Sequence, residues 1–435
     1  MLYNFLKKII RRKNIPEVEV VSEVVKDDFI GFVDELNCSY VCGWVCNQAL
    51  PQDRLVCEAV LSSAGEVLIS SIANKLHYET IKSIGDTSCC YAFFIKFPRI
   101  LNSAEQKEVF IRVKNTEYTV PFAPNLKTDF QPFLRMAMDI VNNCNLRCPF
   151  CLYDYSSTKK TFFMDDDTIN AALRFLPFLP DGDFWFSCLH EPTLHPQLID
   201  YLAKVPEEYR KKIFFTTNLA KKLPDSFFEW VVNSGLHHLN VSLESLDPEI
   251  YERLRKGARQ HIFLNNIDKL KKALKESTHP ISVRYIIMAY KSNLKELPTL
   301  FGKLLGDYNG SLVEVRSSFD APFISRDFKE SEFLDDNDWD WLEVQLKLLP
   351  DNDKVVILRE LTTEESNDDE TPEDVLSGRY MLRLSWDGHL KVFVYEYSSA
   401  LKKRVEKNIL ETNVKEITDI NVFYDQLIGI SNNKI

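Results

Sequence analysis

Apolar positions in the first part of the chain follow the two-residue period of half-buried β-strands. Val109, Ile111 and Val113 occupy every second position, and the Lys-Asn-Thr that follows them is a turn signal. Residues 55–61 form a short apolar-rich run that ends at Ser-Ser-Ala-Gly, which also predicts a turn. We therefore expect residues 31–124 to form a small antiparallel β domain.

The period changes after the proline-containing stretch 124–132, which is typical of a linker. Apolar runs of strand length then alternate with helical patterns that begin near residues 165, 198, 224, 248, 263 and 293. This alternation predicts βα units and a parallel sheet, and thus an α/β fold with a partial (βα)6 TIM-like barrel. The barrel core would span residues 125–305, and the six expected strands are residues 136–140, 184–188, 213–216, 239–243, 283–288 and 313–316.

Residues 306–435 would hold the last barrel strand followed by a small α+β C-terminal extension. Residues 339–346 have helical spacing, and residues 362–374 form an acidic stretch typical of a solvated loop. The apolar runs on either side of residues 386–389, Trp-Asp-Gly-His, predict a β-hairpin.

Residues 1–30 form a separate N-terminal segment with a basic amphipathic start. Within residues 1–14, leucines and isoleucines share one helical face, and lysines and arginines crowd the other side. Such a helix could dock on a partner, or it could make a peripheral contact with an anionic membrane surface, which would place the protein at the inner membrane face. A frayed, solvated terminus is the alternative, and both interpretations stay open.

The composition of the 435-residue chain narrows the possible classes of protein. Hydrophobic residues make up 45% and charged residues 27%, the usual mix of a globular protein with two or three domains. No apolar run approaches the ~18 residues of a membrane span, and no signal-peptide pattern opens the chain, so we expect a cytoplasmic protein. The formal charge of −11 argues against a nucleic-acid partner.

Ten cysteines in such a chain indicate metal or catalytic chemistry in a reducing compartment. The informative cluster is Cys144-Asn-Leu-Arg-Cys148-Pro-Phe-Cys151, directly after the first expected barrel strand, and no cysteine follows Cys188. A structural zinc site or a closed [4Fe–4S] cluster needs four protein ligands. Three cysteines on a cubane leave one iron open for an exogenous ligand.

This CxxxCxxC spacing, with Phe150 before the last cysteine, resembles the radical S-adenosylmethionine (SAM) superfamily. Further motifs follow in the order of that family, most of them at strand ends, where barrels collect their chemistry. They are Leu189-His190-Glu191-Pro192, which is similar to the family's Gly-Gly-Glu-Pro, then Thr217-Asn218, Ser242-Leu243-Glu244, Arg255, and Asn293 with Glu296-Leu297. The resemblance covers residues 133–305.

The resemblance implies that Cys144, Cys148 and Cys151 bind one [4Fe–4S] cluster and that SAM chelates its open iron. An electron from a flavodoxin- or ferredoxin-like donor would cleave SAM, and the resulting 5′-deoxyadenosyl radical would take a hydrogen atom from the substrate. The residues expected to contact SAM are Phe150, His190, Glu191, Asn218, Ser242, Glu244 and Arg255.

Two features depart from the family pattern. Leu189 and His190 replace both glycines, which let backbone approach a ligand closely, so we expect a tighter pocket or a different turn. His190 could contact the cofactor or substrate and transfer a proton, or be purely structural. The C-terminal hairpin resembles a SPASM or twitch extension, but it lacks cysteines, so we expect no auxiliary cluster.

Three residues are weaker candidates for work on the substrate. Cys188 could return a hydrogen atom to the substrate, or it could be an ordinary core thiol. Arg284 and Arg316, in the fifth and sixth expected strands, could hold a carboxylate or phosphate, or form structural ion pairs.

The N-terminal β domain offers a hint about the substrate. Residues 31–34, Gly-Phe-Val-Asp, and Gly43-Trp44 resemble a β domain found beside glycosyltransferases of bacterial surface-polysaccharide systems. This resemblance favours a small molecule or glycan as the substrate: a sugar, nucleotide sugar or glycan intermediate. One alternative is a peptide-modifying enzyme. Another is a non-catalytic interaction protein, in which the three cysteines and His190 or His195 bind zinc.

Overall fold

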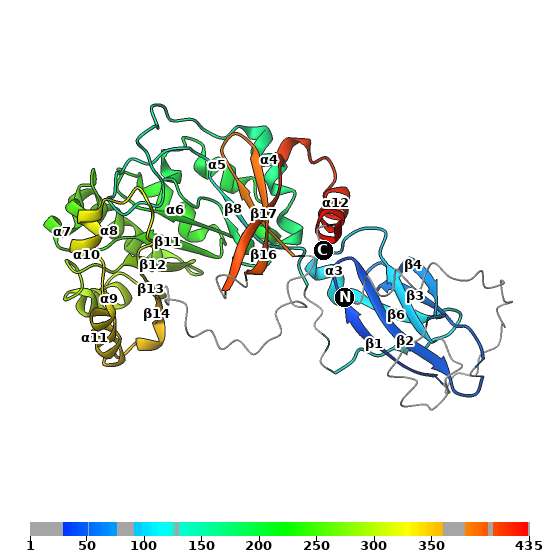
Figure 1. Cartoon of the computed structure of the whole chain (residues 1–435). Helices are drawn as coiled ribbons and strands as arrows, with labels where there is room; N and C mark the ends of the chain where they lie inside the picture. Colours follow the sequence, from blue (N-terminus) through cyan, green and yellow to red (C-terminus); the bar gives the residue numbers. More distant parts are fainter. Residues whose placement is uncertain are drawn as a thin grey trace. The chain divides into compact units, whose positions relative to one another are not determined.

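The computed structural model describes residues 29–50, 52–75, 91–124, 126, 130–359, 379–398 and 403–433. Contacts within the chain divide it into two compact units, Met1–Phe130 and Gln131–Ile435. Figure 1 shows the helices and strands of both units, coloured along the sequence. The predicted amphipathic segment 1–14 and the acidic stretch 362–374 lie outside the described residues.

The described part of the first unit contains two antiparallel sheets, with strand orders β1-β2-β5 and β4-β3-β6-β7. Val33 of β1 pairs with Phe122 beyond β7, and Lys75 beyond β4 pairs with Ala92 of β5. The two sheets are therefore joined at both sides and form a small closed barrel. Its elements are β1 (Phe29–Leu36), β2 (Tyr40–Asn47), β3 (Val56–Leu61), β4 (Glu66–Ile72), β5 (Ala92–Lys96), α3 (Ser103–Glu108), β6 (Val109–Val113) and β7 (Thr119–Val120).

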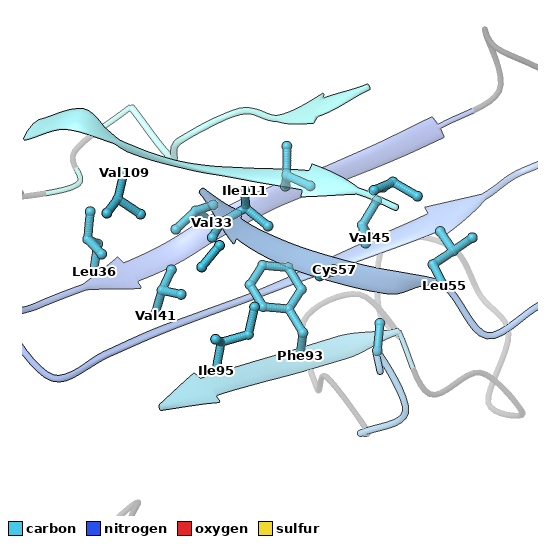
Figure 2. Close-up of a cluster of buried hydrophobic side chains, with 14 of the residues drawn as sticks. Val33, Leu36, Val41, Val45, Leu55, Cys57, Phe93, Ile95, Val109 and Ile111 are labelled. Carbon is cyan, nitrogen blue, oxygen red and sulfur yellow. The ribbon is translucent and has the colours of Figure 1, made fainter. Parts of the chain in front are cut away.

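Apolar side chains from both sheets fill the interior of this barrel (Figure 2). Val33 of β1, Val45 of β2 and Phe93 of β5 meet Cys57 of β3 and Ile111 of β6, and all of them are buried. Burial alternates along β6 as its sequence pattern predicts. The two-residue period thus places one face of each strand in a common core.

Two glycines allow β1 and β2 to approach closely. Gly31 pairs with Val45, and Gly43 pairs with Val33, in the antiparallel register of these strands. A Cβ atom on Gly31 would lie 2.3 Å from the Trp44 carbonyl oxygen, and one on Gly43 would lie 2.2 Å from the Phe32 carbonyl oxygen. No side chain fits at either position without moving the neighbouring strand.

The second unit is built on a ten-stranded sheet of order β14-β13-β12-β11-β10-β9-β8-β15-β16-β17 among the described residues. The pairs from β14 to β15 are parallel, and β15-β16 and β16-β17 are antiparallel. The strands are β8 (Phe133–Met138), β9 (Phe184–Trp185), β10 (Ile213–Thr217), β11 (His238–Ser242), β12 (Ser282–Met288), β13 (Leu312–Arg316), β14 (Val355–Leu358), β15 (Tyr380–Leu384), β16 (His389–Ser398) and β17 (Lys403–Asn413).

Helices connect the parallel strands and bury one apolar face each. In α8, for example, Phe263, Ile267, Leu270 and Leu274 are buried at helical spacing. The α-helices of the described part of this unit are α4 (Asp166–Leu173), α5 (Leu198–Ala203), α6 (Asp225–Asn233), α7 (Pro248–Leu254), α8 (Gln260–Glu276), α9 (Leu297–Gly306), α10 (Arg326–Glu332), α11 (Asp336–Lys347) and α12 (Ile420–Asn433). Short 3-10 helices lie at Leu176–Phe178, Pro192–Leu194, Glu207–Lys212, Asn352–Lys354 and Val414–Glu416.

The six parallel strands expected from the sequence are all present as β8 to β13, and this confirms the α/β, TIM-like fold class. Their ends differ in places, since β8 starts at Phe133 and β9 is only two residues long. The helix expected from residue 293 begins at Leu297. Asn293 precedes this helix and links the ends of β11 and β12, because its side-chain nitrogen donates to the carbonyl oxygens of Glu244 (2.8 Å) and Met288 (3.0 Å).

Two further strands join the parallel sheet, and the sequence pattern did not indicate either of them as barrel strands. β14 pairs with β13, and β15 pairs in parallel with β8. The predicted hairpin is confirmed, since β15 and β16 are antiparallel with Leu384 opposite Leu390. The C-terminal extension therefore continues the barrel sheet beside its first strand.

Candidate functional site

A cavity of about 700 Å³ lies at the carboxyl ends of the parallel strands. The residues that line it come from the ends of β8 to β13 and from β15, β16 and β17. It brings together most of the predicted site residues: Cys144, Cys148, Phe150, Cys151, Cys188, His190, Glu191, Asn218, Ser242, Glu244, Arg255 and Arg316. Residues more than a hundred positions apart in the sequence thus share one cavity.

The three cysteines lie on one loop after β8. The backbone N–H of Cys151 donates to the Cys148 carbonyl oxygen at 3.1 Å, which forms a tight turn between them. The Cys144 sulfur accepts from the N–H of Leu146 at 3.4 Å, and the Cys151 sulfur accepts from the N–H of Tyr153 at 3.4 Å. The loop therefore holds its thiols inward through its own backbone.

The surroundings of these thiols suit thiolates that bind a metal centre. Burial raises the pKa of Cys144 to about 12 and also raises the pKa values of Cys148 and Cys151, whereas the charge of Arg255 lowers all three. Buried thiolates therefore need positive charge nearby, which iron supplies in addition to this guanidinium. The donor set fits a cluster held by three cysteines.

The two histidines of the zinc alternative each have another partner. His195 is buried outside the cavity, with Nε2 3.2 Å from the Met164 carbonyl oxygen and Nδ1 accepting from the N–H of Gln197. The Nδ1 of His190 lies 2.8 Å from the Tyr155 hydroxyl. Within the described ranges, no three histidine, cysteine or carboxylate side chains lie close enough to hold a single metal ion.

Glu191 is a fully buried carboxylate with several fixed donors. Its Oε1 accepts from the Thr193 hydroxyl (2.7 Å) and the Thr217 hydroxyl (2.7 Å), and its Oε2 accepts from the N–H of Asn218 (2.8 Å). Burial raises its pKa, and these hydrogen bonds lower it again. The result is an oriented carboxylate on the cavity wall that joins the ends of β9 and β10.

Asn218 links this carboxylate to the cysteine loop. Its side-chain nitrogen donates to Asn145 Oδ1 at 3.0 Å and to the Cys144 sulfur at 3.5 Å. Asn218 therefore contacts both the Cys144 sulfur and the Glu191 carboxylate, and it couples the positions of these two residues.

Glu244 and Arg255 form a buried pair. Arg255 Nη2 donates to Glu244 Oε1 at 2.8 Å, and a second contact joins Nε to Oε2. Burial raises the pKa of Glu244, and the charge of Arg255 opposes that rise. Both residues line the cavity, as does Ser242, but each of the two charges is already engaged with the other.

Phe150 lines the cavity from the cysteine loop and packs on aromatic rings. Its ring centroid lies 5.1 Å from that of Tyr290 and 6.4 Å from that of Phe328. These contacts fix the ring, and it still lines the cavity, where the sequence predicts a contact with SAM.

The Leu189-His190 departure is explained by a residue that sequence reasoning missed. Asp139, just beyond β8, accepts three hydrogen bonds at Oδ1 from the backbone N–H groups of Cys188 (3.1 Å), Leu189 (2.9 Å) and His190 (3.1 Å). Burial raises the pKa of Asp139 to about 7, against the effect of these hydrogen bonds. The carboxyl group thus fixes the turn without glycine. The sequence signal that could have pointed to this role is a single acidic residue, Asp139, directly after the first barrel strand.

His190 and Cys188 both face the cavity in neutral form. Burial lowers the pKa of His190 to about 4, and its ring packs edge-on to Tyr153 at 4.6 Å. Burial raises the pKa of Cys188 to about 12, so its thiol stays protonated at neutral pH.

The two candidate arginines lie in different places. Arg316, at the end of β13, lines the cavity and pairs with Glu314. Arg284 is not among the lining residues. Burial is the main cause that lowers the pKa values of His237 and His238, and the charge of Arg284 lowers them further. The structure therefore brings Arg316, and not Arg284, to the site.

Several lining residues were not anticipated from the sequence. They are Arg135 in β8, Trp185 in β9, Thr216 in β10, Asn240 in β11, Arg383 in β15, Lys391 in β16 and Glu406 in β17. In the sequence, each of them is a polar or aromatic residue in a strand. Such a residue points to the cavity only when it is known which face of the strand lies inside the barrel.

Comparisons with known proteins agree with this site. Residues 138–300 match the sequence model of the Radical SAM superfamily. A probable GTP 3′,8-cyclase of Methanocaldococcus jannaschii is 28% identical over 171 residues, which cover 38% of this chain and 53% of that protein. A GTP 3′,8-cyclase of Vibrio vulnificus is 25% identical over 170 residues, which cover 38% of this chain and 49% of that protein. The chain thus spans about half the length of these relatives.

Among solved structures, Streptococcus suis SuiB superposes with a TM-score of 0.47 and 15% identity, over 68% of this chain and 67% of that one. This similarity is too weak to bear on the reaction. The match over residues 138–300 includes all three cysteines, Glu191, Asn218, Glu244 and Arg255, the residues that the structure gathers at one cavity. Members of the matched family use a [4Fe–4S] cluster with SAM, and the donor set described above fits both. Residues 138–300 of this chain therefore form a radical SAM domain.

Proposed function

We propose that the chain is an enzyme that reductively cleaves SAM at a [4Fe–4S] cluster and removes a hydrogen atom from a carbohydrate-type substrate. One observation carries the proposal. The cysteine loop and the residues expected to contact SAM come from the ends of four strands, β8 to β11, and from the end of helix α7, and they still line the same cavity. Chance similarity in a short motif does not produce such convergence.

The chain's own residues would bind and orient the reactants. Cys144, Cys148 and Cys151 would ligate the cluster, which together with SAM supplies one-electron cleavage and hydrogen-atom removal. The buried Glu191 carboxylate, which Thr217 and Asn218 hold in place, would accept from the amino group of SAM. The Glu244–Arg255 pair would bind the ribose and carboxylate ends while keeping both charges compensated.

Other residues would keep the site rigid and dry. Asp139 fixes the backbone turn 188–190 that precedes Glu191. Tyr155 holds the His190 ring, and Phe150 is packed against Tyr290. Fixed groups of this kind orient reactants without reorganising during the reaction.

The inner wall of the cavity supports a substrate that carries hydroxyl groups. Asn240 is 6% exposed, and its Nδ2 donates to the Thr216 hydroxyl at 3.3 Å while its Oδ1 is buried without a partner. Either orientation of the amide leaves one polar atom unpaired, and a hydroxyl can satisfy an atom of either kind. Trp185 on the same wall offers an aromatic surface for a sugar ring.

The relatives named GTP 3′,8-cyclase act, by their name, on a nucleotide, which contains a sugar. A nucleotide sugar is therefore consistent with both the relatives and the cavity wall. The reaction would also need a one-electron donor of the flavodoxin or ferredoxin type. Peripheral membrane contact through residues 1–14 stays a prediction, and in the described part of the chain no helix is long and apolar enough to span a bilayer.

Anaerobic reconstitution with iron and sulfide, followed by dithionite and SAM, tests the proposal through the release of 5′-deoxyadenosine. We expect release by the wild type and none by Cys148→Ala. Cys42→Ala, which removes a half-buried thiol in β2, is the matched control and should cleave SAM normally. A wild-type protein that binds a cluster but never releases 5′-deoxyadenosine would refute the proposal.

A further inference from the structure

Cationic side chains from four different strands line one part of the cavity. They are Arg135 of β8, Arg316 of β13, Arg383 of β15 and Lys391 of β16. The charges of the three arginines all act to lower the pKa of the Cys188 thiol, which burial raises. The guanidinium groups therefore converge on the same small region beside Cys188.

Carboxylates hold these cations mostly from outside the cavity. Asp183 pairs with Arg135 at 2.9 Å, Glu314 pairs with Arg316, and Glu411 pairs with Lys391 at 3.2 Å. None of these three carboxylates is among the residues that line the cavity. They orient the cations without covering them.

Of the four acidic residues that line the cavity, Glu191 and Glu244 are engaged with the donors described above, which leaves Glu406 and Asp139 to offset the four cations. Glu406 is paired with Arg383 at 2.5 Å. Asp139 is half-buried, and its Oδ1 is occupied by three backbone N–H groups. The cations on the wall therefore outnumber the carboxylates, and one of the two carboxylates is already compensated.

The guanidinium groups keep donors for a ligand. The side chains of Arg135, Arg316 and Arg383 are 50%, 32% and 52% exposed, although they sit in a cavity. Their hydrogen bonds to carboxylates use Nε and Nη2 of Arg135, Nε of Arg316 and Nη2 of Arg383. Each guanidinium has five N–H donors, so several on each remain for an oxyanion.

We propose that Arg135, Arg316, Arg383 and Lys391 form an oxyanion-binding site for the phosphate or carboxylate group of the sugar substrate. This inference rests on the proposed function and names the substrate class more narrowly, as an acidic or phosphorylated sugar. Arginine binds such groups through paired hydrogen bonds, so the site would fix the orientation of the substrate as well as hold it. The C-terminal extension then has a defined role, because β15 and β16 bring two of the four cations.

The test is binding to the reconstituted full chain, measured by isothermal titration calorimetry with SAM present. The probes are UDP-glucose, glucose 1-phosphate, glucuronate, and maltose as the uncharged sugar. We expect at least one anionic probe to bind more tightly than maltose, with affinity that falls as salt is raised. The first three probes separate pyrophosphate, phosphate and carboxylate as the recognised group.

The variants Arg316→Gln and Arg383→Gln should each weaken binding of that anionic probe about 10-fold or more, since each loses charge-assisted hydrogen bonds. Arg316→Lys keeps the charge but not the fork of donors, and it should lose less. Arg326→Gln, in the exposed helix α10, is the matched control and should bind as the wild type does. Thermal melting of each variant shows whether it is folded.

Equal binding of maltose and the anionic probes, or unchanged binding in the folded arginine variants, would overturn the inference. So would binding of none of the probes at millimolar concentration. The proposed function is judged separately, because the 5′-deoxyadenosine assay measures SAM cleavage and not binding of the probes. Release without anion binding refutes only the oxyanion site, and anion binding without any release refutes only the proposed function.

Discussion

Asp139 provides a direct test of the physical reasoning about the turn at residues 188–190. Its carboxyl group is buried, it accepts three backbone N–H groups at one oxygen, and burial raises its pKa from 3.8 to about 7. Asp139→Asn keeps an acceptor oxygen of the same shape but cannot ionise. Asp139→Ala removes the acceptor and leaves three backbone donors without it.

The expected effect of pH follows from the raised pKa. The unfolded chain loses the Asp139 proton near pH 3.8 and the folded protein near pH 7. Stability from this group is therefore complete below about pH 4 and is lost as the pH rises to about 7. The rise of about 3 pKa units corresponds to about 4 kcal/mol at 1.36 kcal/mol per unit. Of this contribution to the free energy of unfolding, roughly 3 kcal/mol is lost between about pH 5 and about pH 8.

The assay is urea unfolding of wild type and both variants at about pH 5 and about pH 8, with fluorescence as the readout. Subtracting the wild type cancels the other titrating groups, so Asp139→Asn should gain up to about 3 kcal/mol relative to wild type at the higher pH. Asp139→Ala should be less stable than Asp139→Asn by about 2 kcal/mol, because the N–H groups of Leu189 and His190 lose their acceptor, whereas the N–H of Cys188 also donates to the Met138 carbonyl oxygen at 3.0 Å. A pH-independent difference, or equal stability of the two variants, would refute the reasoning.

Three other predictions follow from the site and the barrel. Glu244→Gln leaves Arg255 buried without a counter-charge and should cost about 3 to 5 kcal/mol in urea unfolding. Glu252→Gln, in a pair at the surface, should cost much less, and similar costs for the two variants would contradict the buried pairing. His190 is neutral above about pH 5, so His190→Gln should leave the shape of the pH profile of SAM cleavage unchanged between about pH 6 and 8; a lost inflection would contradict this. Gly43→Ala places a Cβ 2.2 Å from a carbonyl oxygen and should cost about 1 to 3 kcal/mol by thermal melting, and an unchanged melting temperature would contradict the close approach.

The sequence by itself determined the features that depend on near neighbours. The alternation of strands and helices, the hairpin at residues 386–389 and the three-cysteine loop all arise from patterns a few residues long. Residues at the ends of successive parallel strands necessarily meet at one edge of the sheet. The meeting of Cys144, Glu191 and Glu244 at one cavity could therefore be predicted once the strands were placed.

The tertiary structure alone decided what depends on pairing between distant segments. Nothing in the periodicity of residues 380–384 says that β15 lies beside β8, and that pairing brings Arg383 into the cavity. The role of Asp139 likewise depends on backbone donors about fifty positions away. Hydrophobic period specifies which face of a strand is buried but not its neighbour in the sheet, because many pairings would bury the same side chains.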